Sequence, residues 1–253
     1  MRTEKIMFAG GSGMPLGGRL DLPDAGAPRA FAVFAHCFGC TKNLKTMSFL
    51  DHALTAAGIG VLRFDFTGLG ESEGVFADTN FTSNVLDIAA AARMLEAQYE
   101  APRLLIGHSL GGAAALMATR HIPSVAGVVT IAAPASLDHL EAIILSKAPE
   151  IEATGEAEIE LMGRRFRLKR QFIDNLRDQS MSRILDGLKT PLLVMHAPDD
   201  RIVPIAAAER IFGLAHHPKS LVALDRSDHL MLAEENARYA GQIIAAWFAR
   251  YLP

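Results

Sequence analysis

The sequence of 253 residues predicts an α/β fold built on an open, mostly parallel, doubly wound sheet flanked by helices. Short apolar runs recur along the chain without polar alternation, as expected of parallel strands that are covered on both faces. These runs are 31–35, 59–64, 104–106, 128–131, 192–195 and 221–224. Helical patterns lie between them, near 46–57, 81–98, 110–121, 204–215 and 233–250. Two earlier segments, near 4–9 and 17–22, are expected to form an antiparallel edge.

Composition narrows the class of protein. Hydrophobic residues make up 50% of the chain, which is enough for a large core, and the net charge of −3 gives no basic surface for nucleic acid. No apolar run approaches the roughly 20 residues of a membrane span, and the first residues lack the apolar core of a signal peptide. Two cysteines make no disulfide framework, so we expect a protein of the reducing cytoplasm.

The alternation of strands and helices breaks between residues 135 and 189. We expect an inserted cap there, with the core formed by 1–134 and 190–253. Within the insertion, polar and apolar residues alternate with period two over about 158–169, which predicts a β-hairpin. The basic residues of this stretch are therefore interpreted as half of a charge-paired hairpin, with an anion-binding site as the alternative.

The expected turn of this hairpin is Gly163-Arg164, with glycine first as a type II′ turn requires. That register sets four pairs opposite one another: Leu161 with Phe166, Ile159 with Leu168, Glu160 with Arg167, and Glu158 with Lys169. One face is then apolar. The other carries opposite charges, each pair contributing about 0.2–1 kcal/mol.

The segment Gly107-His-Ser-Leu-Gly-Gly112 directly follows the apolar run 104–106 and precedes an alanine-rich helical stretch. A serine on such a tight strand-to-helix turn has an exposed hydroxyl, and Ser109 is the candidate nucleophile. Glycines two residues before and after it are needed where a Cβ would collide with neighbouring backbone. The alternative is a glycine-rich loop that contains an incidental serine.

A serine nucleophile requires a histidine base and an acid that orients it, which in this kind of fold follow the serine in the order acid, then histidine. His229 comes after the run 221–224 and is the candidate base. Asp199 and Asp200 both follow the run 192–195, and one of the two is expected to orient the imidazole while the other caps the turn. Asp225 and Asp228 are interpreted as surface residues or as groups that support the site.

The oxyanion formed in acyl transfer needs two N–H donors. One is expected from Leu110, directly after the nucleophile, and the other from the loop after the run 31–35, at Phe38 or at Cys37. Cys37 and Cys40 form a Cys-X-X-Cys pattern in that loop. Two reduced, packed thiols are the favoured interpretation of this pattern, and a redox pair is the alternative.

Over essentially its whole length the chain resembles the α/β-hydrolase superfamily. His36-Cys-Phe-Gly-Cys-Thr-Lys42, Arg63-Phe-Asp-Phe-Thr-Gly-Leu-Gly-Glu-Ser-Glu-Gly74 and Ala77-Asp-Thr-Asn-Phe81 are similar to a bacterial subfamily encoded fused to, or beside, OsmC-like domains. In the superfamily pattern His-Gly-X-X-Asp-X-X-Val-Pro, counting from His196 selects Asp200 as the acid. The pattern His-Gly-X likewise selects Phe38 as the second donor. Cys37 and Ala197 stand where glycine is usual.

The resemblance implies an α/β-hydrolase fold and a serine carboxylesterase that cleaves short acyl or aryl esters through an acyl-enzyme. This hydrolysis requires no metal or organic cofactor. The apolar face of the cap hairpin is expected to line the substrate pocket with Ile159, Leu161, Phe166 and Leu168. An OsmC-like protein and a second copy of the chain are the expected partners besides the ester. The alternatives are an acyl-thioesterase or peptidase with the same residues, and a non-catalytic binding module of the same fold.

Overall fold

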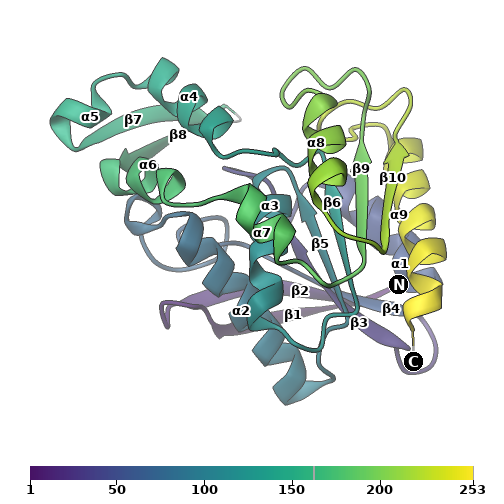
Figure 1. The fold of residues 1–253 in the computed structure, drawn as a ribbon. Helices are drawn as coiled ribbons and strands as arrows, with labels where there is room; N and C mark the ends of the chain where they lie inside the picture. The colour runs from purple at the N-terminus through teal and green to yellow at the C-terminus, as the bar shows by residue number, and fades with distance from the viewer. Residues whose placement is uncertain (162, 253) are drawn as a thin grey trace.

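The computed structural model describes residues 1–161 and 163–252. Eight strands form one sheet in the order β1-β2-β4-β3-β5-β6-β9-β10, and a separate pair, β7-β8, forms a second (Figure 1). The strands of the large sheet are β1 (Arg2–Ala9), β2 (Pro15–Leu22), β3 (Ala30–Ala35), β4 (Ile59–Phe64), β5 (Leu104–His108), β6 (Gly127–Ile131), β9 (Leu192–His196) and β10 (Lys219–Ala223). Two neighbouring pairs of this sheet, β1–β2 and β2–β4, are antiparallel. The predicted mostly parallel sheet with an antiparallel edge is confirmed.

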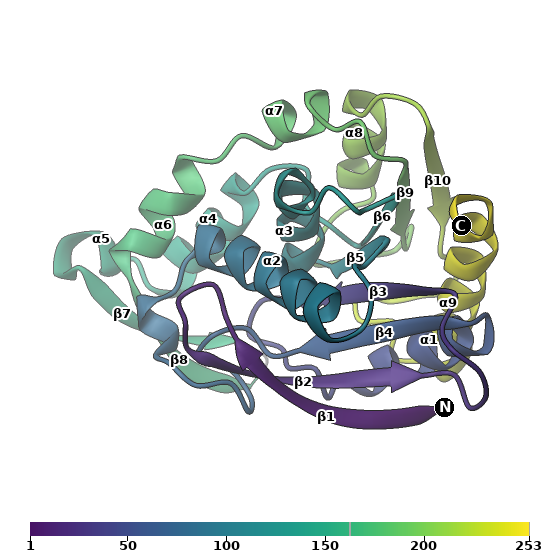
Figure 2. The same ribbon diagram turned by 90° about the horizontal axis from the view of Figure 1, so that it is seen from below.

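Helices cover both faces of the sheet, and its central strands are mostly apolar: every residue of β3, β4, β5, β6 and β9 is buried. On one face, α1 and α9 share a core cluster with the strands, and on the other, α2, α3 and α8 share a second cluster (Figure 2). The bounds are α1 (Lys45–Ala56), α2 (Phe81–Gln98), α3 (Leu110–Ala118), α8 (Ala206–Leu214) and α9 (Glu234–Phe248). Three short 3₁₀ helices are η1 (Phe76–Asp78), η2 (Thr119–His121) and η3 (Ala249–Tyr251).

The segment between β6 and β9 extends to one end of the molecule, where α4, α5, β7, β8 and α6 lie far from α9, and it returns to the body of the fold through α7, which lies beside α3 (Figure 1). Its elements are α4 (Asp138–Lys147), α5 (Ile151–Thr154), β7 (Glu156–Leu161), β8 (Arg164–Lys169), α6 (Arg170–Arg177) and α7 (Met181–Asp186). The predicted hairpin is present. None of the helices in the described residues has the length and apolarity that a membrane crossing requires.

The register of the hairpin differs from the expected one by two residues. Leu161 pairs with Arg164, so Gly163, with φ +71°, is the second residue of the connection and not the first. The observed pairs are Ile159 with Phe166, Ala157 with Leu168, Glu160 with Arg165, Glu158 with Arg167, and Glu156 with Lys169. A shift of two keeps every side chain on its face, because strands have a period of two. Polar–apolar alternation alone therefore could not distinguish the two registers.

Candidate active site

The parallel strands of the sheet end at one edge, and the loops that follow four of them carry the candidate residues. These loops follow β3, β5, β9 and β10, and they contain Phe38, Ser109, Asp200 and His229 respectively. Ligands collect at the carboxyl edge in sheets of this type.

Ser109 lies on the turn between β5 and α3 with φ 53° and ψ −122°, a conformation that a non-glycine residue rarely adopts. The flanking glycines are required by close approach. A Cβ on Gly107 would lie 2.2 Å from the Gly111 carbonyl oxygen, and a Cβ on Gly111 would lie 2.3 Å from that of Ala35 and 2.5 Å from that of His36. The serine turn is thus pressed directly against the start of the loop after β3.

His229 and Asp200 are joined by a hydrogen bond of 2.7 Å between Nδ1 and Oδ2. Asp200 is buried, and its other oxygen accepts the N–H groups of Ile202 and Val203 at 2.8 and 2.9 Å. Burial by itself would raise the pKa of Asp200, but the hydrogen bond from His229 and the two N–H groups outweigh burial and lower it. Asp200 is therefore a fixed carboxylate that holds one tautomer of the imidazole.

Among the described residues, Asp200 is the only one of the candidate acids that forms a hydrogen bond with the His229 ring. Asp199 is exposed, as are Asp225 and Asp228. Asp228 accepts the N–H of Leu230 at 2.8 Å and so shapes the loop that carries His229. Of the two adjacent aspartates, Asp200 is therefore the one that bonds His229.

A cavity of about 310 Å³ is lined by residues from several of the candidate loops. Ser109, Leu110, His229, Phe38 and Cys37 all line it. Leu110 is the first residue of α3, and among the described residues neither its N–H nor that of Phe38 donates a hydrogen bond within the protein. Two unpaired donors beside a serine are the arrangement that an oxyanion needs.

The segment between β6 and β9 lines the cavity mainly through α4, with His139, Leu140, Ile143 and Lys147, and through Glu160 of β7. Sequence reasoning missed α4. Its signal was the apolar spacing of Leu140, Ile143 and Ile144, which the more regular hairpin pattern overshadowed.

The expected pocket residues of the hairpin lie elsewhere. Ile159, Phe166 and Leu168 are buried in the main core cluster and do not line the cavity. Phe166 packs on Phe76, with ring centroids 4.9 Å apart. The side chain of Leu161 lies outside the described residues. The apolar face of the hairpin thus packs against the core, and the neighbouring helix faces the cavity.

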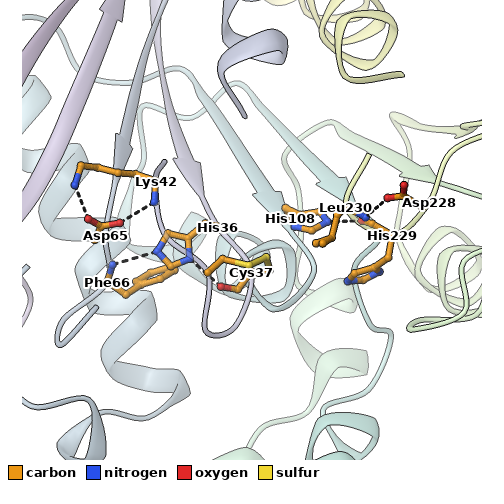
Figure 3. Close-up of a disulfide and its surroundings, with 10 residues drawn as sticks. His36, Cys37, Lys42, Asp65, Phe66, His108, Asp228, His229 and Leu230 are labelled. Carbon is orange, nitrogen blue, oxygen red and sulfur yellow. Dashed lines mark hydrogen bonds and ion pairs between the residues drawn. A yellow bond between two sulfur atoms is a disulfide. The ribbon is translucent and has the colours of Figure 1, made fainter. Parts of the chain in front are cut away.

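Cys37 and Cys40 are joined by a disulfide, with Cα atoms 5.3 Å apart, in place of the two free thiols that we favoured from composition. Both residues are buried. The bond lies within the loop after β3 (Figure 3). Phe38 lies between the two bonded cysteines in the sequence.

A second feature that sequence reasoning missed is a buried ion pair between Lys42 and Asp65 (Figure 3). Asp65 also accepts the backbone N–H of Lys42 at 2.7 Å and that of Glu71 at 2.9 Å. Asp65 follows β4, so this pair ties the loop after β3 to the neighbouring strand. Both residues lie in the motifs that carry the family resemblance. Within the described residues, no group of three or more His, Cys, Asp or Glu side chains is arranged to hold a metal ion.

A mostly parallel sheet with a serine on a strained turn, beyond the same edge as a bonded His–Asp pair, is the architecture of the α/β hydrolases. A sequence profile of the Alpha/beta hydrolase family matches residues 32–242, and the chain belongs to that family.

Comparison with known proteins agrees with this family assignment. The crystal structure of the esterase domain from a Rhodothermus marinus protein is 42% identical, with a TM-score of 0.81 and full coverage of both chains. The uncharacterized protein YfhR of Salmonella typhimurium is 26% identical over 230 residues, which span 90% of this chain and 75% of YfhR. The mitochondrial palmitoyl-protein thioesterase ABHD10 of Mus musculus is 27% identical over 61% of this chain and 54% of its own length.

Proposed function

We propose that the protein is a serine hydrolase that cleaves short acyl or aryl carboxylic esters through an acyl-enzyme intermediate. The observation that carries the proposal is that one cavity is lined both by Ser109, on its strained turn, and by His229, which Asp200 holds by a 2.7 Å hydrogen bond. Similarity to an esterase domain at 42% identity supports the same chemistry.

In the proposed reaction, the hydroxyl oxygen of Ser109 attacks the ester carbonyl while Nε2 of His229 takes its proton. Asp200 stabilises the imidazolium that forms. The N–H groups of Phe38 and Leu110 donate to the oxyanion of the tetrahedral intermediate. The alcohol then leaves with the proton from His229, and a water molecule, activated by the same ring, releases the acid and restores Ser109.

The size of the cavity supports a small acyl or aryl group. About 310 Å³ is at the lower end of the range for small-molecule sites. Leu140 and Ile143 of α4 give this cavity apolar wall residues. We therefore assign the cap's contribution to substrate selection to α4, with 135–189 as the cap segment and 1–134 with 190–253 as the core.

A fluorophosphonate probe tests the nucleophile, and p-nitrophenyl esters of increasing chain length together with hydroxycinnamate esters test the substrate class. We expect labelling that Ser109→Ala abolishes and Ser124→Ala leaves intact, because Ser124 bonds the Pro102 carbonyl at 2.8 Å, outside the cavity. Well-folded protein that neither labels nor turns over any ester would support the non-catalytic binding module instead.

An acyl-thioesterase is the second candidate, favoured by the similarity to mouse ABHD10. Only the leaving group differs, so the ratio of kcat/KM for an acyl-thioester and for the matched oxygen ester decides between the two. Peptide hydrolysis by the same residues is tested with a matched amide. A cytoplasmic location, an OsmC-like partner and a homodimer stay predictions.

A further inference from the structure

The loop after β3 is anchored firmly at both ends. At its start, Nδ1 of the buried His36 donates to the Cys37 carbonyl over 2.8 Å, and Nε2 accepts the N–H of Phe66 over 3.4 Å. At its end, Lys42 is held by Asp65, and its carbonyl accepts a hydrogen bond of 2.8 Å from Arg63. These anchors fix the two ends of the loop to β4 and to the segment that follows it.

Between the anchors, residues 37–40 form a turn that is held by hydrogen bonds and by the disulfide. Two hydrogen bonds converge on the Cys37 carbonyl, one from His36 and one from the Cys40 N–H over 3.1 Å. The disulfide is the covalent link across this turn. The ring of Phe38 packs on Phe172 with centroids 5.1 Å apart, but ring packing constrains the side chain more than the direction of the N–H.

The disulfide is sheltered from bulk solvent and yet borders the cavity. Cys37 and Cys40 are 5% and 6% exposed, while Cys37 lines the cavity at Ser109. A small molecule that enters as a substrate would therefore meet the Cys37 side of the disulfide.

We propose that the Cys37–Cys40 disulfide is a thiol–disulfide exchange site for small dithiols, and that its reduction releases the Phe38 N–H from its position and slows hydrolysis. This inference rests on the proposed function for its catalytic consequence. The disulfide closes a turn that contains the donor, so breaking it frees the segment on which the donor's direction depends.

The exchange proceeds in two balanced steps. A thiolate of the dithiol attacks the sulfur of Cys37, forms a mixed disulfide and expels the Cys40 thiolate, which takes up a proton. The second thiol of the reductant loses its proton, and the resulting thiolate attacks the reductant's other sulfur in the mixed disulfide and expels the Cys37 thiolate, which is protonated in turn. Two electrons pass to the protein, which gains two thiols, and the dithiol leaves as a cyclic disulfide.

The effect is expected on kcat, because an oxyanion donor acts when charge develops and not when substrate binds. Loss of one such donor costs on the order of 10²–10³-fold in kcat. Displacement of the donor is a smaller change, and we expect a loss of about tenfold or more, with KM changed by less than about threefold.

The test begins with oxidised protein whose thiols are counted by maleimide labelling and intact mass. Dithiothreitol is added, then removed, and three quantities are measured: the thiol count, kcat and KM for p-nitrophenyl acetate, and hydrogen exchange in peptide 36–44. We expect two new thiols, a lower kcat and faster hydrogen exchange in that peptide. On reoxidation, kcat and the exchange rate should return to their original values. The variant Cys37→Ser/Cys40→Ser is expected to have the kcat of the reduced protein and no response to dithiothreitol.

Two results would overturn the proposal: a disulfide that dithiothreitol does not open in the folded protein, or two counted thiols with unchanged kcat and unchanged exchange. Fluorophosphonate labelling of the oxidised wild type separates this outcome from failure of the proposed function. If oxidised protein neither labels at Ser109 nor hydrolyses esters, the hydrolase proposal fails. The exchange rate of peptide 36–44 then still shows whether the disulfide holds the loop.

Discussion

The buried ring of His108 donates a hydrogen bond from Nε2 to the backbone carbonyl of His229 over a distance of 2.7 Å (Figure 3). The two rings also pack together, with centroids 5.1 Å apart. His108 directly precedes Ser109, so one residue of the serine turn holds the backbone of the loop that carries the proposed base. Since the carbonyl can only accept, the proton of His108 must reside on Nε2.

Replacing His108 by leucine is expected to lower kcat by about tenfold, because His229 loses the partner of its carbonyl and an unsatisfied buried group costs about 1–3 kcal/mol. His108→Gln carries an amide donor at a similar reach and should retain most of the activity. KM should change little in either variant. Equal losses in the two variants, or a change confined to KM, would contradict a positioning role for this hydrogen bond.

Buried histidines should make the protein less stable in mild acid. Burial, together with the nearby His229, lowers the pKa of His108 to about 3, and burial also lowers the pKa of His36. The unfolded chain takes up protons as pH falls through about 6.5, whereas the folded protein does not. The stability contributed by the neutral rings is therefore fully present above pH 6.5 and is lost as pH falls from there towards 3.

For His108 alone, this loss reaches about 1.4 kcal/mol per pH unit below 6.5. Urea unfolding between pH 7.5 and 4.5 measures it. His108→Gln should give a shallower decline in the free energy of unfolding than the wild type, and the exposed His121→Gln should give the wild-type decline. Parallel curves for wild type and His108→Gln would show that the ring is protonated in the folded state as well.

The adjacent aspartates provide a matched pair of variants. Asp200→Asn removes the charge that stabilises the imidazolium and can present an N–H to Nδ1 of His229, which favours the wrong tautomer. We expect kcat to fall by on the order of 10³–10⁴-fold. Asp199→Asn, at the exposed neighbour, should stay within about twofold. Comparable losses at both positions would show that the loop as a whole, and not the contact of Asp200 with His229, matters.

Local backbone chemistry explains which parts of the site could be predicted from sequence. The serine turn was recognisable because its pattern lies within six consecutive residues. One of its close approaches is also local, since a Cβ on Gly107 would lie 2.2 Å from the Gly111 carbonyl oxygen. Asp200 and His229 were recognisable because parallel strands end at a common edge, so chain order predicts proximity. The family resemblance then favoured Asp200 over Asp199, and contact with His229 now gives the same choice.

Features that depend on packing between distant segments could not be predicted. The hairpin pattern predicted strands at 158–169 but not that Phe166 would pack on Phe76 instead of facing the cavity. Lys42 and Asp65 are both buried and carry opposite charges. No periodicity in the sequence links them, so their pairing could not be predicted. The disulfide depended on whether the loop brings Cys37 and Cys40 within bonding distance, and spacing alone left that open.

The contact between the serine turn and the loop after β3 makes Gly111 sensitive to a single methyl group. A Cβ there would lie 2.3 Å from the Ala35 carbonyl oxygen. Gly111→Ala should therefore destabilise the protein by about 1–3 kcal/mol or more and displace the loop that carries Phe38. Gly213→Ala in α8, where the added Cβ would meet no atom within 4 Å apart from its chain neighbours and the nearby backbone of its own helix, should stabilise by up to about 1 kcal/mol through helix propensity. Thermal unfolding of both variants measures the contrast, and similar melting temperatures would mean that the close approach is relieved at little cost.

The wall that α4 adds to the cavity should determine chain-length preference. Ile143 lines the cavity, so Ile143→Ala enlarges the space opposite Ser109, and the best p-nitrophenyl ester should become longer by about two to four carbons. Leu145 lies on the same helix but packs against the core cluster and does not line the cavity, so Leu145→Ala should lower stability and leave the preference unchanged. The measurement is kcat/KM across acyl chains from two to twelve carbons, because one methylene in an apolar pocket is worth about 1–3 kcal/mol. An unchanged profile for Ile143→Ala would refute the role of α4 in substrate selection, and a shift for Leu145→Ala alone would indicate that the cap acts through its packing.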